Sequence, residues 1–158
     1  MMMNRQRKIF AAILSSAFLL TTTIAVAQTS GNVSKRDKKI MEDVRAVLDT
    51  QVAAWNRGDI DGFMDGYARS SETVFVSGDK VTRGWQTVLD RYKKSYDTRE
   101  KMGTLSFSDL EITPLGKDAA VVLGSWKLTR AADTPHGRFT LIFRRTSAGW
   151  RIVHDHTS

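Results

Sequence analysis

Two histidines and an aspartate close to the end of the printed sequence are the side chains best suited to chemistry. His154, Asp155 and His156 fall in residues 149–158, a run of β-branched and aromatic residues that predicts a strand. Side chains two positions apart on a strand point to the same face, so the two imidazoles are expected about 6–7 Å apart. Asp155 is expected to point to the opposite face.

The pair of histidines has three interpretations. They could act as a base and its partner in a pocket, because imidazole is easily tuned near neutral pH. They could bind a metal ion, although that needs a third ligand and the remaining histidine, His136, falls in a loop. They could also share one face with Trp150 and Ile152 and be hydrogen-bonded in a core or subunit interface. We predict no metal site and no cofactor.

Asp155 becomes the best general-base candidate if its face lines a cavity. A carboxylate in apolar surroundings has a raised pKa, which suits proton abstraction. The alternative is an ion pair with an arginine of a neighbouring strand, such as Arg138 or Arg144. Alternation along the strand does not say which face is inside.

The elements that would position these residues follow from hydrophobic periodicity and turn signals. Apolar residues at helical spacing predict a long helix over 35–56, and Gly58 and Asp59 favour a tight corner and the cap of a short helix that reaches Tyr67. A short strand pair is expected between 73 and 83, and a third helix after Gly84. Four strands follow, over 105–114, 119–130, 138–145 and 150–158, with short connections typical of an antiparallel meander.

The first 27 residues have the layout of a secretory signal peptide. A basic start with Arg5, Arg7 and Lys8 precedes a largely apolar run, and small residues end it at Ala27. We therefore expect cleavage after Ala27 and a periplasmic or secreted protein; the alternative is a retained N-terminal anchor. The predicted organisation is a signal peptide over 1–27, a flexible leader over 28–34 and one domain over 35–158.

Composition argues against several partners. The formal net charge of +7 falls to +4 when the three basic residues of the signal are removed, which is ordinary for a soluble surface. No basic stripe with interleaved aromatic residues is present, so nucleic acid is not expected, nor is a membrane after cleavage. The absence of cysteine excludes disulfides and a thiol nucleophile.

Three stretches together give a family resemblance. They are Ala54-Trp55-Asn56-Arg57-Gly58-Asp59 after the long helix, Gly84-Trp85 at the start of the third helix, and Trp150-Arg151-Ile152-Val153-His154-Asp155-His156-Thr157-Ser158. The chain resembles the nuclear-transport-factor-2-like superfamily, and within it an exported bacterial branch of unknown function. That branch is similar to the polyketide cyclase and ketosteroid isomerase group and to the association domain of calcium/calmodulin-dependent kinase, whose last strand carries a related Trp…Val-His-x-His-x-Ser pattern.

The resemblance implies an α+β fold in which a strongly curved antiparallel sheet wraps around the long N-terminal helix as a cone with one open end. Relatives place an acid/base carboxylate and tyrosines in this pocket, bind small carboxylates there, or serve as binding proteins. They also commonly associate through the outer face of the sheet, which implies a homodimer. Fold alone does not choose among these functions.

Five further residues are candidates for binding a ligand in such a pocket. Tyr67 and Trp126 would stack on a flat ligand or donate a hydrogen bond near the mouth of the cone. Asp65 on the short helix is a secondary carboxylate candidate. Lys127 resembles a basic pocket residue of the kinase association domain, but it and Arg130 fall on opposite faces of their strand, so at most one points inward.

The leading hypothesis is an exported, homodimeric domain that binds a small, partly apolar molecule. The first alternative is a metal-independent isomerase or cyclase that uses a pocket aspartate or histidine as its general base. The second is a non-catalytic oligomerisation module.

Overall fold

The computed structural model describes residues 33–158. The predicted signal peptide and most of the predicted leader lie outside the described residues. The order of elements is two helices, two short strands, two helices and four long strands. No helix within residues 33–158 has the length and apolar character needed to cross a bilayer.

The long helix α1 (Lys35–Asn56) has the predicted bounds. Ser34 caps its start by accepting a hydrogen bond from the Asp37 amide, and buried residues repeat along one side at helical spacing. The chain then turns at Gly58, whose φ is +88°. Asp59 caps α2 (Ile60–Met64) through the Gly62 amide at 2.7 Å. The predicted corner and cap are therefore confirmed.

Six strands form one sheet in the order β2-β1-β6-β5-β4-β3. The strands β3 (Thr104–Pro114), β4 (Ala119–Thr129), β5 (His136–Thr146) and β6 (Gly149–Thr157) make the expected antiparallel meander. The hairpin of β1 (Val74–Ser77) and β2 (Lys80–Arg83) extends the sheet by pairing β1 with β6 in parallel. That parallel pairing was not predicted, because periodicity and turn residues indicate only how segments close together in the sequence pair with each other.

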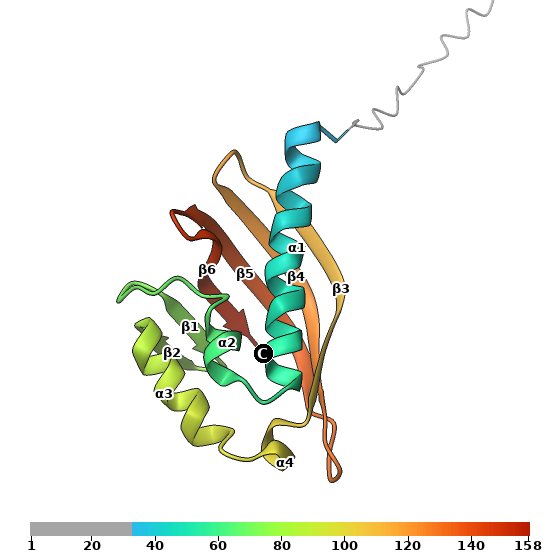
Figure 1. Cartoon of the computed structure of the whole chain (residues 1–158), viewed down its shortest axis with the longest axis vertical. Coiled ribbons are helices and arrows are strands. Elements are labelled where there is room, and N and C mark those ends of the chain that lie inside the picture. Colours follow the sequence, from blue (N-terminus) through green and yellow to red (C-terminus); the bar gives the residue numbers. More distant parts are fainter. Residues whose placement is uncertain (1–32) are drawn as a thin grey trace, which may run out of the picture. The chain divides into compact units, whose positions relative to one another are not determined.

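Helix α1 lies across the concave side of this sheet, and α3 (Trp85–Ser95) runs beside the β1–β2 hairpin (Figure 1). The short helix α4 (Arg99–Met102), which was not predicted, leads into β3. Buried side chains of α1, α2, α3 and the inner face of the sheet form one core. The α+β class and the bent sheet over one long helix are thus as expected.

Irregularities in three strands accompany the bend of the sheet. Register shifts interrupt β3 between Ser108 and Glu111 and the β5–β6 pairing at Val153. In β4, a Cβ on Gly124 would lie 2.5 Å from the Phe139 ring and 2.7 Å from Leu110. Bulges bend and twist a strand, and glycine permits this close approach across the inner face.

Candidate functional site

A cavity of about 350 Å³ lies between the inner face of the sheet and the helices. This volume falls in the range of small-molecule sites. Its wall is largely aromatic and aliphatic; the lining includes Trp55, Phe63, Phe75, Phe107, Trp126, Leu128, Phe139, Leu141 and Ile152. Ser77 and Ser95 line it while being solvent-exposed, so its mouth lies beside the ends of β1 and α3. The cavity is mainly apolar with few polar groups.

Asp155 supplies the one carboxylate among the described residues that line this cavity. It is 4% exposed and accepts hydrogen bonds from the Tyr67 hydroxyl and from Thr157 Oγ1, both at 2.6 Å. Burial raises the pKa of Asp155 to about 6, against the hydrogen bonds from Thr157 and Tyr67 and the charge of Arg91, which lower it. Each carboxylate oxygen keeps a lone pair for a ligand, because each accepts one protein hydrogen bond.

A β-bulge turns Asp155 inward. In β6, Ile152 lies opposite Phe143 and His154 lies opposite Ile142, so Val153 is the extra residue. Beyond it, Asp155 pairs with Leu141 and joins Ile152 on the inner face. Bulges are common next to functional sites because they re-aim side chains in this way.

The bulge also decides the position of the histidines. The expectation that His154 and His156 share a face with Trp150 and Ile152 is wrong: Trp150 and Ile152 are buried, whereas the histidines lie on the outer face, half-buried and exposed respectively. Alternation fails because it assumes an unbroken pleat. The predicted geometry of the pair itself, two positions apart on one face, agrees with the pairing of His154 to Val74 and His156 to Val76.

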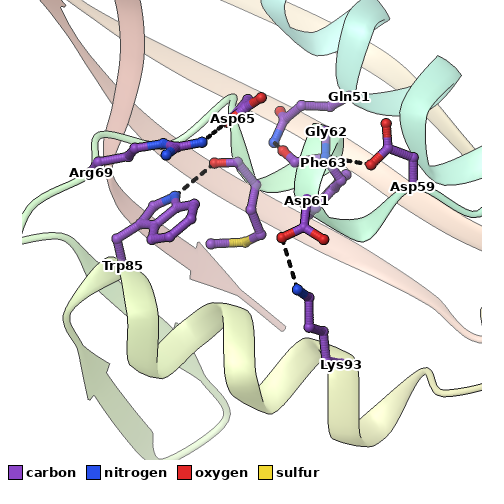
Figure 2. A network of polar contacts seen from close by, with 10 residues as sticks. Gln51, Asp59, Asp61, Gly62, Phe63, Asp65, Arg69, Trp85 and Lys93 are labelled. Carbon is purple, nitrogen blue, oxygen red and sulfur yellow. Dashed lines mark hydrogen bonds and ion pairs between the residues drawn. The ribbon is translucent and has the colours of Figure 1, made fainter.

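Helix α2 and its anchors position Tyr67. Gln51 of α1 donates to the Phe63 carbonyl at 3.0 Å, and the Trp85 indole donates to the Met64 carbonyl at 2.9 Å (Figure 2). These bonds satisfy carbonyls at the C-terminal end of a helix, which have no partner within it. Tyr67 follows directly, forms a bridge with Ile152 of β6 and is 3% exposed.

The outer side of α2 carries ion pairs that do not reach the cavity. Asp61 pairs with Lys93 of α3 at 2.9 Å, and Asp65 pairs with Arg69 at 2.7 Å (Figure 2). Asp65 is exposed and is absent from the cavity wall. Its carboxylate is therefore not placed to meet a ligand bound there.

The other predicted ligand-binding residues divide into two groups. Tyr67 and Trp126 line the cavity, as expected. Lys127 is exposed on the outer face opposite His136, and Arg130 lies after β4, where it pairs with Asp133 at 3.3 Å. Neither basic residue lines the cavity, because β4 turns Trp126 and Leu128 inward instead.

Sequence reasoning overlooked Arg91 of α3 and did not single out its neighbour Tyr92 as a site residue, although both line the cavity. Burial and the charge of Asp155 raise the pKa of Tyr92, so its hydroxyl stays protonated. A weak signal was present: Arg91 and Tyr92 lie three and four residues after the apolar Val88, the spacing of neighbours on a helix surface.

Within residues 33–158, no group of three or more histidine, cysteine, aspartate or glutamate side chains is placed to hold a metal ion. What the cavity offers is general acid–base chemistry by one buried carboxylate, hydrogen bonding by tyrosines and an aromatic wall. A bent sheet over one long helix with such a cavity is the architecture of the nuclear-transport-factor-2-like class.

The chain belongs to the SnoaL-like domain family, whose model matches residues 44–158. A search of curated proteins found no match. Among solved structures, an NTF-2 like protein of unknown function from Shewanella oneidensis MR-1 is 40% identical with a TM-score of 0.73, over 75% of this chain and 98% of that one.

Two more distant structures support the fold alone. A putative calcium/calmodulin dependent protein kinase II association domain from Xanthomonas campestris has a TM-score of 0.59 at 20% identity, over 73% of this chain and 84% of that one. A nuclear transport factor 2 (NTF2-like) superfamily protein from Salmonella enterica has a TM-score of 0.61 at 22% identity, over 77% and 91%.

Proposed function

We propose that the domain binds a small, largely apolar molecule in the cavity, with its polar end at Asp155. The observation that carries this proposal is a buried carboxylate, held by Tyr67 and Thr157, in an otherwise aromatic cavity of ligand size. A buried charge lowers the stability of the fold. Natural proteins keep such a destabilising group mainly where it has a function, such as binding a ligand.

The test is a thermal-shift screen of diverse small molecules against wild type and Ser95→Trp. Ser95 is exposed at the mouth, so a tryptophan there is expected to obstruct the cavity without disturbing the core. Ser106→Trp, on an exposed position of β3 outside the cavity, is the matched control. Hits that survive in Ser95→Trp, or a screen without hits, would contradict the proposal.

A second function, proton transfer in a metal-independent isomerase or cyclase, is favoured by the pKa of about 6 at Asp155. In this reaction the carboxylate takes a proton from a carbon next to a carbonyl; the electron pair of the C–H bond forms a C=C bond, and the π pair of the carbonyl moves to its oxygen. If the resulting enolate is conjugated with a second C=C bond, return of the proton at the far carbon restores the carbonyl and shifts the double bond, which completes an isomerisation.

Deuterium exchange tests this second function without knowledge of the natural substrate. Enolisable ketones are incubated with the protein in D2O and followed by mass spectrometry. Exchange above the buffer rate is expected for wild type and for His156→Asn on the outer face, and it should fall at least about a hundredfold in Asp155→Asn. Equal exchange in wild type and Asp155→Asn would exclude Asp155 as the base.

We also propose that the domain is a homodimer through the outer face of the sheet. Exposed apolar residues lie on this face: Val81, Leu123 and Ile142 are 54%, 40% and 38% exposed. His154 lies between Val74 and Ile142, so the histidines would be interface residues. If this face assembles but no ligand is ever found, the oligomerisation module becomes the better description.

Export completes the proposal and rests on the sequence of residues 1–27 alone. The full chain, produced in a bacterium with an outer membrane, is expected in the periplasmic fraction with an intact mass that begins at Gln28. A cytoplasmic product that keeps Met1 would refute it.

A further inference from the structure

Arg91 is the one basic side chain among the described residues that line the cavity. Its guanidinium lies 4.3 Å from the centre of the Phe75 ring and 5.8 Å from that of Tyr92. One hydrogen bond holds it, from Nη1 to Thr82 Oγ1 at 3.3 Å. The residue is half-buried one turn before Ser95, whose exposure marks the mouth.

Arg91 forms no ion pair within residues 33–158, and its charge acts on Asp155 only from a distance, where it lowers the pKa of that carboxyl. Nine ion pairs join other basic residues there to carboxylates, and none of them includes Arg91. The cavity's own carboxylate accepts its hydrogen bonds from Tyr67 and Thr157 instead. A guanidinium has five N–H donors, so most of those of Arg91 remain free for a ligand.

The contacts with the Phe75 and Tyr92 rings fix the position of the Arg91 side chain without pairing its charge with a carboxylate. A guanidinium stacked on rings is fixed in orientation, while its edge stays available for hydrogen bonds. The planar fork of arginine fits the two oxygens of a carboxylate, and partial burial strengthens the resulting charge-assisted bonds. The neighbouring wall of Phe107, Trp126 and Phe139 suits a flat apolar body.

We propose that Arg91 is the anion-recognition residue of the cavity and that the ligand is a planar, largely apolar carboxylate. This inference rests on the proposed binding function and specifies its ligand class. The carboxylate group contacts Arg91 on the side of the mouth, the ring system lies against the aromatic wall, and any second polar group of the ligand meets Asp155.

Calorimetric titration with matched pairs of probes tests the inference: benzoate and benzamide, cinnamate and cinnamamide, 2-naphthoate and 2-naphthamide. Each pair keeps its shape and differs in charge. Wild type is expected to bind the carboxylate of at least one pair about tenfold or more tightly than the amide. Arg91→Met should abolish that preference while amide binding persists.

Two further variants keep the result interpretable. Arg91→Lys retains the charge but loses the fork, so the preference should fall at least about threefold even if the methionine variant does not fold. Lys94→Met removes the same charge from an exposed position of α3 outside the cavity, and it should behave as wild type.

The other possible results distinguish a failure of the role of Arg91 from a failure of ligand binding by the cavity. Amides that bind as tightly as carboxylates, or a preference that survives in both Arg91 variants, would overturn the role of Arg91 and leave the binding pocket standing. If wild type binds no probe at all, the planar-carboxylate class is overturned. Hits among other classes in the thermal-shift screen would then show whether the binding function itself survives.

Discussion

Burial controls the chemistry of Asp155. Its folded-state pKa of about 6 exceeds the ordinary value of 3.8, so the folded protein binds this proton more tightly than the unfolded chain does, by about 3 kcal/mol. As the pH rises, the unfolded state loses the proton first, so this group lowers the stability of the fold between about pH 4 and about pH 6. Well above pH 6, the ionised Asp155 lowers the stability of the fold by the full amount of about 3 kcal/mol.

The first prediction is that Asp155→Asn stabilises the protein at pH 8. The uncharged amide avoids the cost of the buried charge, so the free energy of unfolding should rise by about 1–3 kcal/mol at pH 8 and little or not at all at pH 4. Urea unfolding at both pH values measures this. A loss of stability at pH 8 would show that the hydrogen bonds of the carboxylate outweigh its desolvation.

The second prediction concerns Tyr67, whose hydroxyl stabilises the charged form of Asp155. Tyr67→Phe should raise the pKa of Asp155 above about 6, because the removed hydrogen bond lowers it in the wild type. Carboxyl carbon NMR measures the titration. Tyr96→Phe is the control: Tyr96 also lines the cavity, but no hydrogen bond joins it to Asp155 within the described residues. An equal shift in both variants would point to a general change of the cavity.

Strand β4 shows how an element shapes the site. Gly124 faces the core where the sheet bends, and Phe139 and Leu110 pack against its bare backbone. Phe139 lines the cavity together with Phe107 and Trp126, so the glycine helps to set the width of the cavity. Beyond it, β4 must keep its alternation to turn Trp126 and Leu128 inward.

The third prediction is that Gly124→Ala destabilises the fold by about 1–3 kcal/mol. The new methyl group would approach the Phe139 ring to 2.5 Å, and the surrounding core has to move to accept it. Chemical denaturation measures the loss. Ser106→Ala, on an exposed position of β3, should change stability by less than about 0.5 kcal/mol. Similar effects of the two changes would mean that the core near Gly124 is looser than described.

For the whole molecule, the two faces of the sheet have different tasks. The inner face encloses the cavity, and the outer face carries apolar residues interspersed with His154 and His156. One β-bulge assigns Asp155 to the first face and both histidines to the second. Acid–base chemistry and assembly are therefore expected to respond to different substitutions.

The fourth prediction follows from that separation. Ile142→Asp places a charge between Val121 and His154 on the outer face and should convert a dimer into a monomer in sedimentation, with unchanged circular dichroism. Lys117→Asp, a change at another exposed position, in the β3–β4 turn, is the control. A monomeric wild type at micromolar concentration would refute the dimer.

Much of the architecture could be read from the sequence, because its signals are local. The bounds of α1, the Gly58 corner, the Asp59 cap and the four-strand meander depend on periodicity and turn residues that lie close together in the chain. The family resemblance was carried by short motifs of the same kind. Tyr67, Trp126 and Asp155 were named as site residues from these elements, and they do meet in one cavity.

The tertiary structure alone decided which face is inside and which charges meet there. The Val153 bulge exists only in the pairing of β6 with β5, and the parallel pairing of β1 with β6 joins segments about 80 residues apart. Arg91 becomes a cavity residue only because α3 packs over Phe75. Burial, and with it the pKa of Asp155, depends on neighbours brought from the whole chain, whereas periodicity records only neighbours within a few residues.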